Sequence, residues 1–253
     1  MADDRLLEVR DLSLRFGGIT ALEKVGLHVA EGETLAVIGP NGSGKTSLFN
    51  CITGLYRPTS GAIAFRGGSL LGLSPDRVTA RGVARTFQNL RLFFHMTVLD
   101  NLMLGRHLHF RKSLLAAALR LRGEEVRHRA RCEEIIEFLN LEAWREMRVG
   151  GCAYGVQKRV ELGRALATEP KLLLLDEPVS GLTAEEKDEV SYWIHEIRGR
   201  FGVTILLVEH DLRVASRLAS RMVVLDRGTK LTEGTPEEVQ RHPGVIRAYL
   251  GDQ

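Results

Sequence analysis

A short apolar run that leads directly into a glycine-rich loop is the feature that most constrains the fold of this chain. Thr34–Ile38 is followed without a break by Gly39-Pro40-Asn41-Gly42-Ser43-Gly44-Lys45-Thr46, and the residues from Ser47 to Leu55 then predict a helix. Strand, G-x4-G-K-T loop and helix together are typical of a phosphate-binding loop. Its glycines turn backbone N–H groups toward phosphate oxygens, and the helix presents its N-terminus to the same anion. We therefore expect Lys45 to reach the β- and γ-phosphates and the Thr46 hydroxyl to bind Mg²⁺.

A second apolar run ends in two carboxylates. Leu172–Leu175 has the continuous apolar character of a strand that is buried on both faces of a parallel sheet, and Asp176 and Glu177 follow it directly. Parallel sheets bind ligands at the carboxyl ends of their strands. We expect Asp176 to hold Mg²⁺ and Glu177 to accept a proton from the attacking water or to orient it.

A third run, Val203–Val208, repeats this arrangement and is followed by Glu209 and His210. A single histidine is usually without a special role. His210 lies at the ligand-binding edge of the same predicted sheet, however, and this position favours a contact with the γ-phosphate.

The rest of the chain predicts one α/β core with a helical insertion. Residues 6–38 contain alternating apolar and polar residues that suit antiparallel strands, whereas residues 90–167 are helical in texture. A helix over 184–199 and a further strand at Met222–Leu225 continue a βαβ rhythm. Two capping boxes, one beginning at Thr183 and one at Thr235, mark helix starts.

Composition excludes several classes of protein. The net charge of +3 is too small to indicate a nucleic-acid partner, and three cysteines without paired spacing indicate reduced thiols rather than a zinc site or disulfides. The first residues lack the pattern of a signal peptide, and no apolar stretch approaches a membrane-spanning length. The basic stretch Arg106–Arg131 favours a solvated helical face, with contact to the cytoplasmic leaflet as the alternative.

These motifs, with others in a fixed order, give the chain a resemblance to the nucleotide-binding subunits of ABC transporters over essentially its whole length. The other motifs are Arg85-Thr86-Phe87-Gln88, Tyr154-Gly155-Val156-Gln157-Lys158-Arg159 and Ser180-Gly181-Leu182. The resemblance implies ATP and Mg²⁺ as ligands and ATP hydrolysis as the activity. It also implies an α/β fold with a P-loop (RecA-like) core and parallel sheet, an N-terminal antiparallel β subdomain and an inserted α-helical subdomain.

The resemblance further implies roles for individual residues. Gln88 would lie near Mg²⁺ and the water and link the site to the helical subdomain, and Phe16 would stack on adenine, with a strand-core aromatic as the alternative. Arg91–Met96 would meet the membrane partner. The signature residues Ala153, Tyr154, Gly155, Val156 and Gln157 would face the ATP of the opposite subunit.

A single ABC ATPase domain over 1–253 is implied, with a nucleotide-binding core (1–89 and 168–235), a helical subdomain (90–167) and a C-terminal helix (236–253). Within the family the chain is most similar to the ATPases of branched-chain amino acid importers. This similarity rests on Phe16–Leu22, Gln88–Phe93 with Met96–Val98, the 106–131 insertion, and the ending Gly234–Pro236 through Ala248–Gly251. Importers of urea and short-chain amides share much of this pattern and remain alternatives.

The signature loop departs from the family's usual Leu-Ser-Gly-Gly-Gln. Ala153 lacks the serine hydroxyl, and Cys152 and Val156 depart further. We therefore expect a heterodimer in which a second ATPase subunit with a fuller signature completes this chain's ATP site.

Transmembrane permease subunits are the other expected partners, with a periplasmic or surface solute-binding protein as an indirect one and no nucleic acid. The expected location is cytoplasmic, peripheral on the inner face of the plasma membrane. A soluble ABC ATPase that acts on nucleic acid or ribosomes is an alternative, but the chain lacks a long coiled coil or second ATPase module. A non-hydrolysing sensor is the other alternative. No Asn-Lys-x-Asp guanine motif supports a GTPase.

Overall fold

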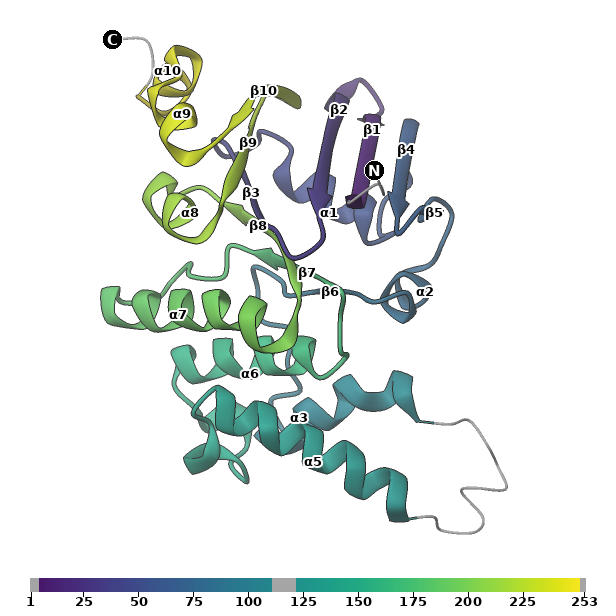
Figure 1. Cartoon of the computed structure of the whole chain (residues 1–253), viewed down its shortest axis with the longest axis vertical. Helices are drawn as coiled ribbons and strands as arrows, with labels where there is room; N and C mark the ends of the chain where they lie inside the picture. The colour runs from purple at the N-terminus through teal and green to yellow at the C-terminus, as the bar shows by residue number, and fades with distance from the viewer. Residues whose placement is uncertain (1–4, 111–121, 251–253) are drawn as a thin grey trace.

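The computed structural model describes residues 5–110 and 122–250 (Figure 1). The strands are β1 (Arg5–Phe16), β2 (Ile19–Ala30), β3 (Thr34–Ile38), β4 (Ser60–Phe65), β5 (Gly68–Ser69), β6 (Val83–Arg85), β7 (Leu172–Asp176), β8 (Thr204–Glu209), β9 (Arg221–Asp226) and β10 (Thr229–Gly234). The α-helices are α1 (Lys45–Ile52), α2 (Pro75–Ala80), α3 (Val98–Gly105), α5 (Arg122–Phe138), α6 (Tyr154–Leu166), α7 (Ala184–Phe201), α8 (Leu212–Leu218), α9 (Pro236–Arg241) and α10 (Pro243–Leu250). No helix in the described residues is both long and apolar enough to cross a membrane.

The larger sheet has the strand order β10-β9-β3-β8-β7-β6 within the described residues, and only β10 runs antiparallel to its neighbour. Every residue of β3, β7 and β8 is buried, as the continuous apolar runs predict for central parallel strands. Because these strands are parallel, their carboxyl ends share one edge. The phosphate loop follows β3 there, and Arg85, Asp176 and Glu209 are the last residues of β6, β7 and β8.

The predicted antiparallel region is also confirmed. Strands β1 and β2 form a hairpin, and β4 and β5 extend it in the order β2-β1-β4-β5. Alternate side chains of β1 and β2, such as Leu12 and Val25, are fully buried. The tip of the hairpin pairs Phe16 with Ile19 and leaves both side chains exposed. The fold is therefore α/β with an antiparallel N-terminal sheet.

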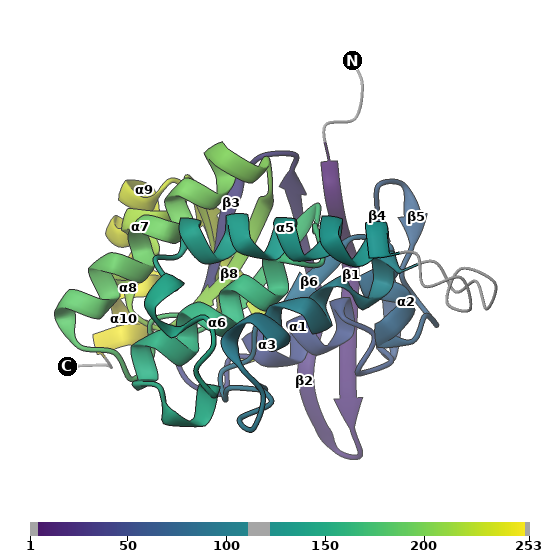
Figure 2. The same cartoon turned by 90° about the horizontal axis from the view of Figure 1, so that it is seen from below.

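Alternation along the central strands separates two hydrophobic cores. Leu172 and Leu174 of β7 pack with the antiparallel sheet and Phe49 of α1, whereas Leu173 and Leu175 pack with the helices on the other face. In Figures 1 and 2, helices α3, α5 and α6 lie side by side at the end of the molecule remote from the antiparallel sheet. The six-stranded sheet thus separates the two cores, with the antiparallel sheet and α1 packed on one face and helices such as α6 on the other.

Several helix boundaries differ from the sequence predictions. The helix expected over 47–55 begins at Lys45 and ends at Ile52, because Thr53 caps it and Gly54 takes a left-handed φ of 75°. In place of one helix over 236–253, α9 and α10 are separated at His242, where Pro243 supplies no N–H and restricts the preceding residue. Residues 251–253 lie outside the described part.

The helix expected over 184–199 extends to Phe201, and both predicted capping boxes are present, at Thr183 with Glu186 and at Thr235 with Glu238. The basic stretch is described only in part, since residues 111–121 lie outside the described ranges. Arg106 contradicts a purely solvated face, because its side chain is buried and pairs with Glu169 at 3.0 Å.

Candidate nucleotide-binding site

The phosphate loop has a backbone that only glycine accommodates at two of its positions. Gly39 and Gly44 have φ angles of 152° and 104°. A Cβ at Gly39 would lie 2.1 Å from the carbonyl oxygen of Leu225, and one at Gly44 would lie 2.7 Å from that of Ala21. The loop is therefore packed closely against β9 and β2, an approach that only residues without a Cβ allow at these two positions.

Lys45 and Ser43 hold their polar groups inside this loop. The Lys45 ammonium donates to the carbonyl oxygens of Gly39 at 2.7 Å and Pro40 at 2.9 Å. Burial lowers the pKa of Lys45, and the carboxylates at the ends of β7 and β8 oppose that shift. The buried Ser43 hydroxyl has no hydrogen-bond partner within residues 5–110 and 122–250, whereas Thr46, in the first turn of α1, is exposed. An anion in the loop would give Ser43 the partner it lacks.

The Glu177 side chain, just after β7, is contacted by one residue that follows β6 and one that follows β8. The amide Nε2 of Gln88 donates to its Oε2 at 2.9 Å, and Nδ1 of His210 lies 3.6 Å from its Oε1. Glu177 also has a left-handed φ of 48°, while its N–H donates to the carbonyl of Val208. Such a backbone in a residue other than glycine costs free energy, and residues strained in this way cluster at functional sites. The sequence-predicted residues Gln88, Glu177 and His210 are therefore brought together.

Arg85 is a residue that the motif analysis did not assign to the site. Its Nη2 donates to Oδ2 of Asp176 at 2.6 Å, and its Nη1 donates to Oδ1 of Asn50 at 2.6 Å. Only 6% of the Arg85 side chain and 4% of the Asp176 side chain are exposed. In the sequence Arg85 stands three residues before Gln88, and this position alone does not indicate a pairing with Asp176.

Glu209 is the second residue that the motif analysis did not assign. It is 1% exposed, and its Oε2 lies 4.0 Å from Nδ1 of His210. Burial, with the nearby Glu177 carboxylate, raises the pKa of Glu209 to about 7. A carboxyl group with this pKa is largely protonated below neutral pH and adds little negative charge next to Glu177.

Phe16 is exposed rather than packed in the strand core, so the core alternative for this residue is wrong. Its exposed fraction is 48%, and its ring meets the edge of Tyr56 at a centroid distance of 5.2 Å. Tyr56, just after α1, is also exposed and was not singled out from the sequence. An accessible aromatic pair on the strand hairpin and the α1 loop is a suitable platform for a purine base.

The signature residues begin α6 and make no hydrogen bond to the phosphate loop among the described residues. Cys152 and Val156 are buried in the hydrophobic core, so their departures from the usual signature alter packing rather than the exposed surface. Gln157 donates back to the carbonyls of Val149 and Cys152. Ala153 and Tyr154 are exposed, and Ala153 is therefore the departure that changes what a facing ligand would meet.

Comparisons with known proteins agree with this geometry. The family model described as "ABC transporter" matches residues 22–180, and the model described as "Branched-chain amino acid ATP-binding cassette transporter" matches residues 229–253. The high-affinity branched-chain amino acid transport ATP-binding protein BraF of Pseudomonas aeruginosa is 40% identical over 98% of both chains. Its Escherichia coli counterpart named LivG is also 40% identical over 98% of both chains.

Solved structures show the same fold. The ADP conformation of an ATP-binding cassette from an ABC transporter superposes with a TM-score of 0.86 at 30% identity, covering 98% of this chain and 99% of that chain. A dimeric cassette in a post-hydrolysis state, bound to ADP and Pi, gives a TM-score of 0.78 at 27% identity, covering 91% and 98%.

The parallel sheet, the phosphate loop after β3 and the acidic end of β7 define a nucleotide-binding protein of the P-loop class. The family match and the relatives narrow this class. The chain belongs to the ABC transporter family, as an ATP-hydrolysing subunit.

Proposed function

We propose that this chain powers an importer of branched-chain amino acids or of a related small polar solute, with Glu177 as the general base of ATP hydrolysis. The observation that carries the catalytic assignment is the convergence of Gln88 and His210 on the Glu177 carboxylate. The relatives named for branched-chain amino acid transport support the substrate class.

The residues present fit ATP with Mg²⁺. The Thr46 hydroxyl, the Asp176 carboxylate and the amide oxygen of Gln88 would hold the ion, and Gln88 keeps that oxygen free because its nitrogen is the atom that donates to Glu177. Mg²⁺ takes oxygen ligands, and in nucleotide sites it usually binds one or two carboxylates together with substrate phosphates and several waters. When bound, the ion neutralises charge on the phosphates.

The chain's own groups then have distinct tasks. Glu177 accepts a proton from the water whose oxygen attacks the γ-phosphorus, the bond from that phosphorus to the β–γ bridging oxygen breaks and ADP leaves, and Gln88 keeps the carboxylate oriented. The Lys45 ammonium and the loop N–H groups stabilise negative charge on the phosphate oxygens. The exposed imidazole of His210, half of which is solvent-accessible, would contact the γ-phosphate. Phe16, with Tyr56 beside it, would hold the adenine.

A second ATPase subunit would complete the site. Ala153 offers a facing γ-phosphate no hydroxyl, so only backbone N–H groups and the N-terminus of α6 remain. We infer a heterodimer in which the sister subunit presents the fuller signature to this chain's ATP. The purified chain alone should show weak ATPase activity, and mixing with the sister subunit should raise it; strong cooperative hydrolysis by the chain alone would refute the heterodimer.

Membrane permease subunits are the proposed site of attachment, which would place the chain in the cytoplasm on the inner face of the plasma membrane. Phe93 and Phe94, within the predicted contact segment Arg91–Met96, are 56% and 42% exposed and support such a contact. A solute-binding protein would act only through the permease, and the proposal involves no nucleic acid.

Uptake into proteoliposomes tests the proposed function. The chain would be reconstituted with its proposed permease and sister ATPase subunits, and radiolabelled leucine and urea would be offered separately with their binding proteins. ATP-dependent leucine uptake that Lys45→Ala abolishes is expected. Urea uptake without leucine uptake would overturn the substrate class, and an absence of ATP-dependent uptake of either would overturn the importer assignment.

A further inference from the structure

Arg85 forms a buried ion pair with Asp176, the carboxylate that is the proposed Mg²⁺ ligand. Among the described residues, it is the only side chain that donates a hydrogen bond to Asp176, and it contacts one oxygen, Oδ2, at 2.6 Å. A buried ion pair is stable only when further hydrogen bonds satisfy its polar groups. The other contacts of the guanidinium therefore decide whether the pair is stable.

The Arg85 guanidinium makes three further sets of contacts, with the end of α1, with the Phe49 ring and with the Phe87 ring. Nη1 donates to Asn50 at 2.6 Å and, over a longer 3.4 Å, to the Thr53 hydroxyl, both near the C-terminal end of α1. The rings of Phe49 and Phe87 lie 5.4 and 4.9 Å from its central carbon. Cations are attracted to aromatic faces at such distances. Arg85 thus joins β6, α1 and the segment that carries Gln88 to one oxygen of Asp176.

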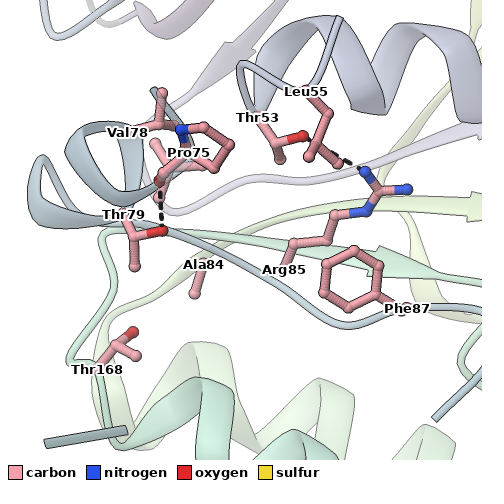
Figure 3. Close-up of a pocket in the computed structure, with 10 residues that line it drawn as sticks. Thr53, Leu55, Pro75, Val78, Thr79, Ala84, Arg85, Phe87 and Thr168 are labelled. Carbon is pink, nitrogen blue, oxygen red and sulfur yellow. Dashed lines mark hydrogen bonds between the residues drawn. The ribbon is translucent and has the colours of Figure 1, made fainter. Parts of the chain in front are cut away.

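Close packing alone does not determine where the Arg85 guanidinium lies. Arg85, Thr53 and Phe87 line a cavity of about 160 Å³, which Figure 3 shows with the Thr53–Arg85 hydrogen bond drawn. In the part of the chain that the structure describes, the buried Nε of Arg85 has no hydrogen-bond partner. Because space remains beside the side chain, its hydrogen bonds to Asn50 and Asp176 set where the guanidinium lies.

Because Arg85 contacts only Oδ2 of Asp176, it can be asked whether the guanidinium would compete with a metal ion or orient the carboxylate for it. A guanidinium that occupied both carboxylate oxygens would compete with the ion. Arg85 takes only Oδ2, which leaves Oδ1 available, and breaking a buried ion pair is strongly unfavourable. The pair is therefore expected to persist when the metal binds and to keep the carboxylate in one orientation.

We propose that Arg85 is a positioning residue that sets the Asp176 carboxylate for Mg²⁺ binding through its hydrogen bond to Oδ2. The inference rests on the proposed function, in which Asp176 is a metal ligand. Removing a hydrogen-bond partner of a metal ligand lowers metal affinity roughly 10- to 100-fold.

The test measures metal dependence apart from turnover. ATP binding to the full-length chain is followed with N-methylanthraniloyl-ATP, first in EDTA and then in a Mg²⁺ titration. Arg85→Met should raise the half-saturating Mg²⁺ concentration about 10- to 100-fold and leave binding in EDTA unchanged. Arg106→Met is the matched control, because Arg106 is an equally buried, ion-paired arginine outside the site, and it should leave the titration unchanged.

The outcomes for three variants separate a failure of this inference from a failure of the proposed function. An unchanged titration for Arg85→Met, or equal shifts for Arg85→Met and Arg106→Met, would overturn the inference while the proposed function stands. If Arg85→Met does not fold, Asn50→Ala removes the second anchor instead; a smaller shift in the same direction supports the inference and no shift overturns it. If Asp176→Asn leaves the titration unchanged, the metal assignment in the proposed function fails, and the inference fails with it.

Discussion

The side-chain amide of Gln88 donates to Oε2 of Glu177 over 2.9 Å and connects this carboxylate, the proposed general base, to the helical region. The Gln88 carbonyl accepts from the Lys158 ammonium at 3.3 Å. Buried Glu161, one turn further along α6, accepts from the N–H groups of Phe87 and Arg91. The helix that begins with the signature is therefore hydrogen-bonded to the segment that orients Glu177, so movement of one is expected to affect the other.

Gln88→Ala should slow ATP hydrolysis and leave ATP binding in EDTA unchanged, because without Mg²⁺ the Gln88 amide oxygen has no ion to hold. The loss of one hydrogen bond to a charged group corresponds to a reduction of about 10- to 100-fold. Asn89→Ala, at the exposed neighbouring position, is the control. Because Gln88 acts partly through Glu177, the loss of activation free energy in a Gln88→Ala/Glu177→Gln double variant should be smaller than the sum of the two single losses, and fully additive losses would argue against this coupling.

Phe16→Ala should weaken ATP and GTP binding equally, since stacking does not depend on the base. Loss of one aromatic stack amounts to about 1–3 kcal/mol of binding free energy. Ile19→Ala, on the same hairpin tip and 72% exposed, should have no effect. Fluorescence titration of each variant provides the measurement, and unchanged affinity in Phe16→Ala would remove this residue from the adenine site.

Glu209 should make folding stability depend on pH. Its pKa is about 7 in the folded chain against an ordinary 4.5, so between these pH values the native state retains a proton that the unfolded state has lost. Its contribution to stability is complete below about pH 4.5 and is lost as the pH rises through about 7, by about 3 kcal/mol at most.

Urea unfolding of the wild type and Glu209→Gln from pH 5 to pH 8 checks this prediction. The glutamine variant should gain stability relative to the wild type as the pH rises. Parallel stability curves would show that Glu209 titrates normally in the folded chain.

Thr183→Ala should destabilise the start of α7 by about 1 kcal/mol, the usual effect of losing a capping residue. The Thr183 hydroxyl accepts from the N–H of Glu186 at 3.3 Å, and the Glu186 carboxylate accepts from the N–H of Thr183 at 2.9 Å. Thr183→Ser retains the hydroxyl and should unfold at nearly the wild-type urea concentration. Equal losses for both variants would mean that the threonine methyl group, rather than the cap, carries the effect.

Patterns of neighbouring residues in the sequence predicted those parts of the fold that are determined by neighbouring residues. The phosphate loop, the buried strands β7 and β8 and the capping boxes each follow from neighbouring residues. Gln88 was assigned through the family resemblance, and the structure supplies the contact that no local pattern indicates, its bond to Glu177.

Other features depend on which strands become neighbours. Arg85 and Asp176 belong to strands separated by the whole helical insertion, and only the strand order places their ends side by side. A lone arginine in the sequence carries no sign of that pairing. Val156 likewise looked like a weakened signature residue until its burial showed that it packs in the core.

The most direct test of the central claim is phosphate release by the assembled complex with Glu177→Gln in this chain. We predict that hydrolysis at this chain's site falls by about 10²- to 10⁴-fold, the contribution of a positioned general base, while ATP binding is retained. Glu185→Gln, an exposed position in the first turn of α7, should leave the rate unchanged. A Glu177→Gln complex that turns over at the wild-type rate would contradict the account.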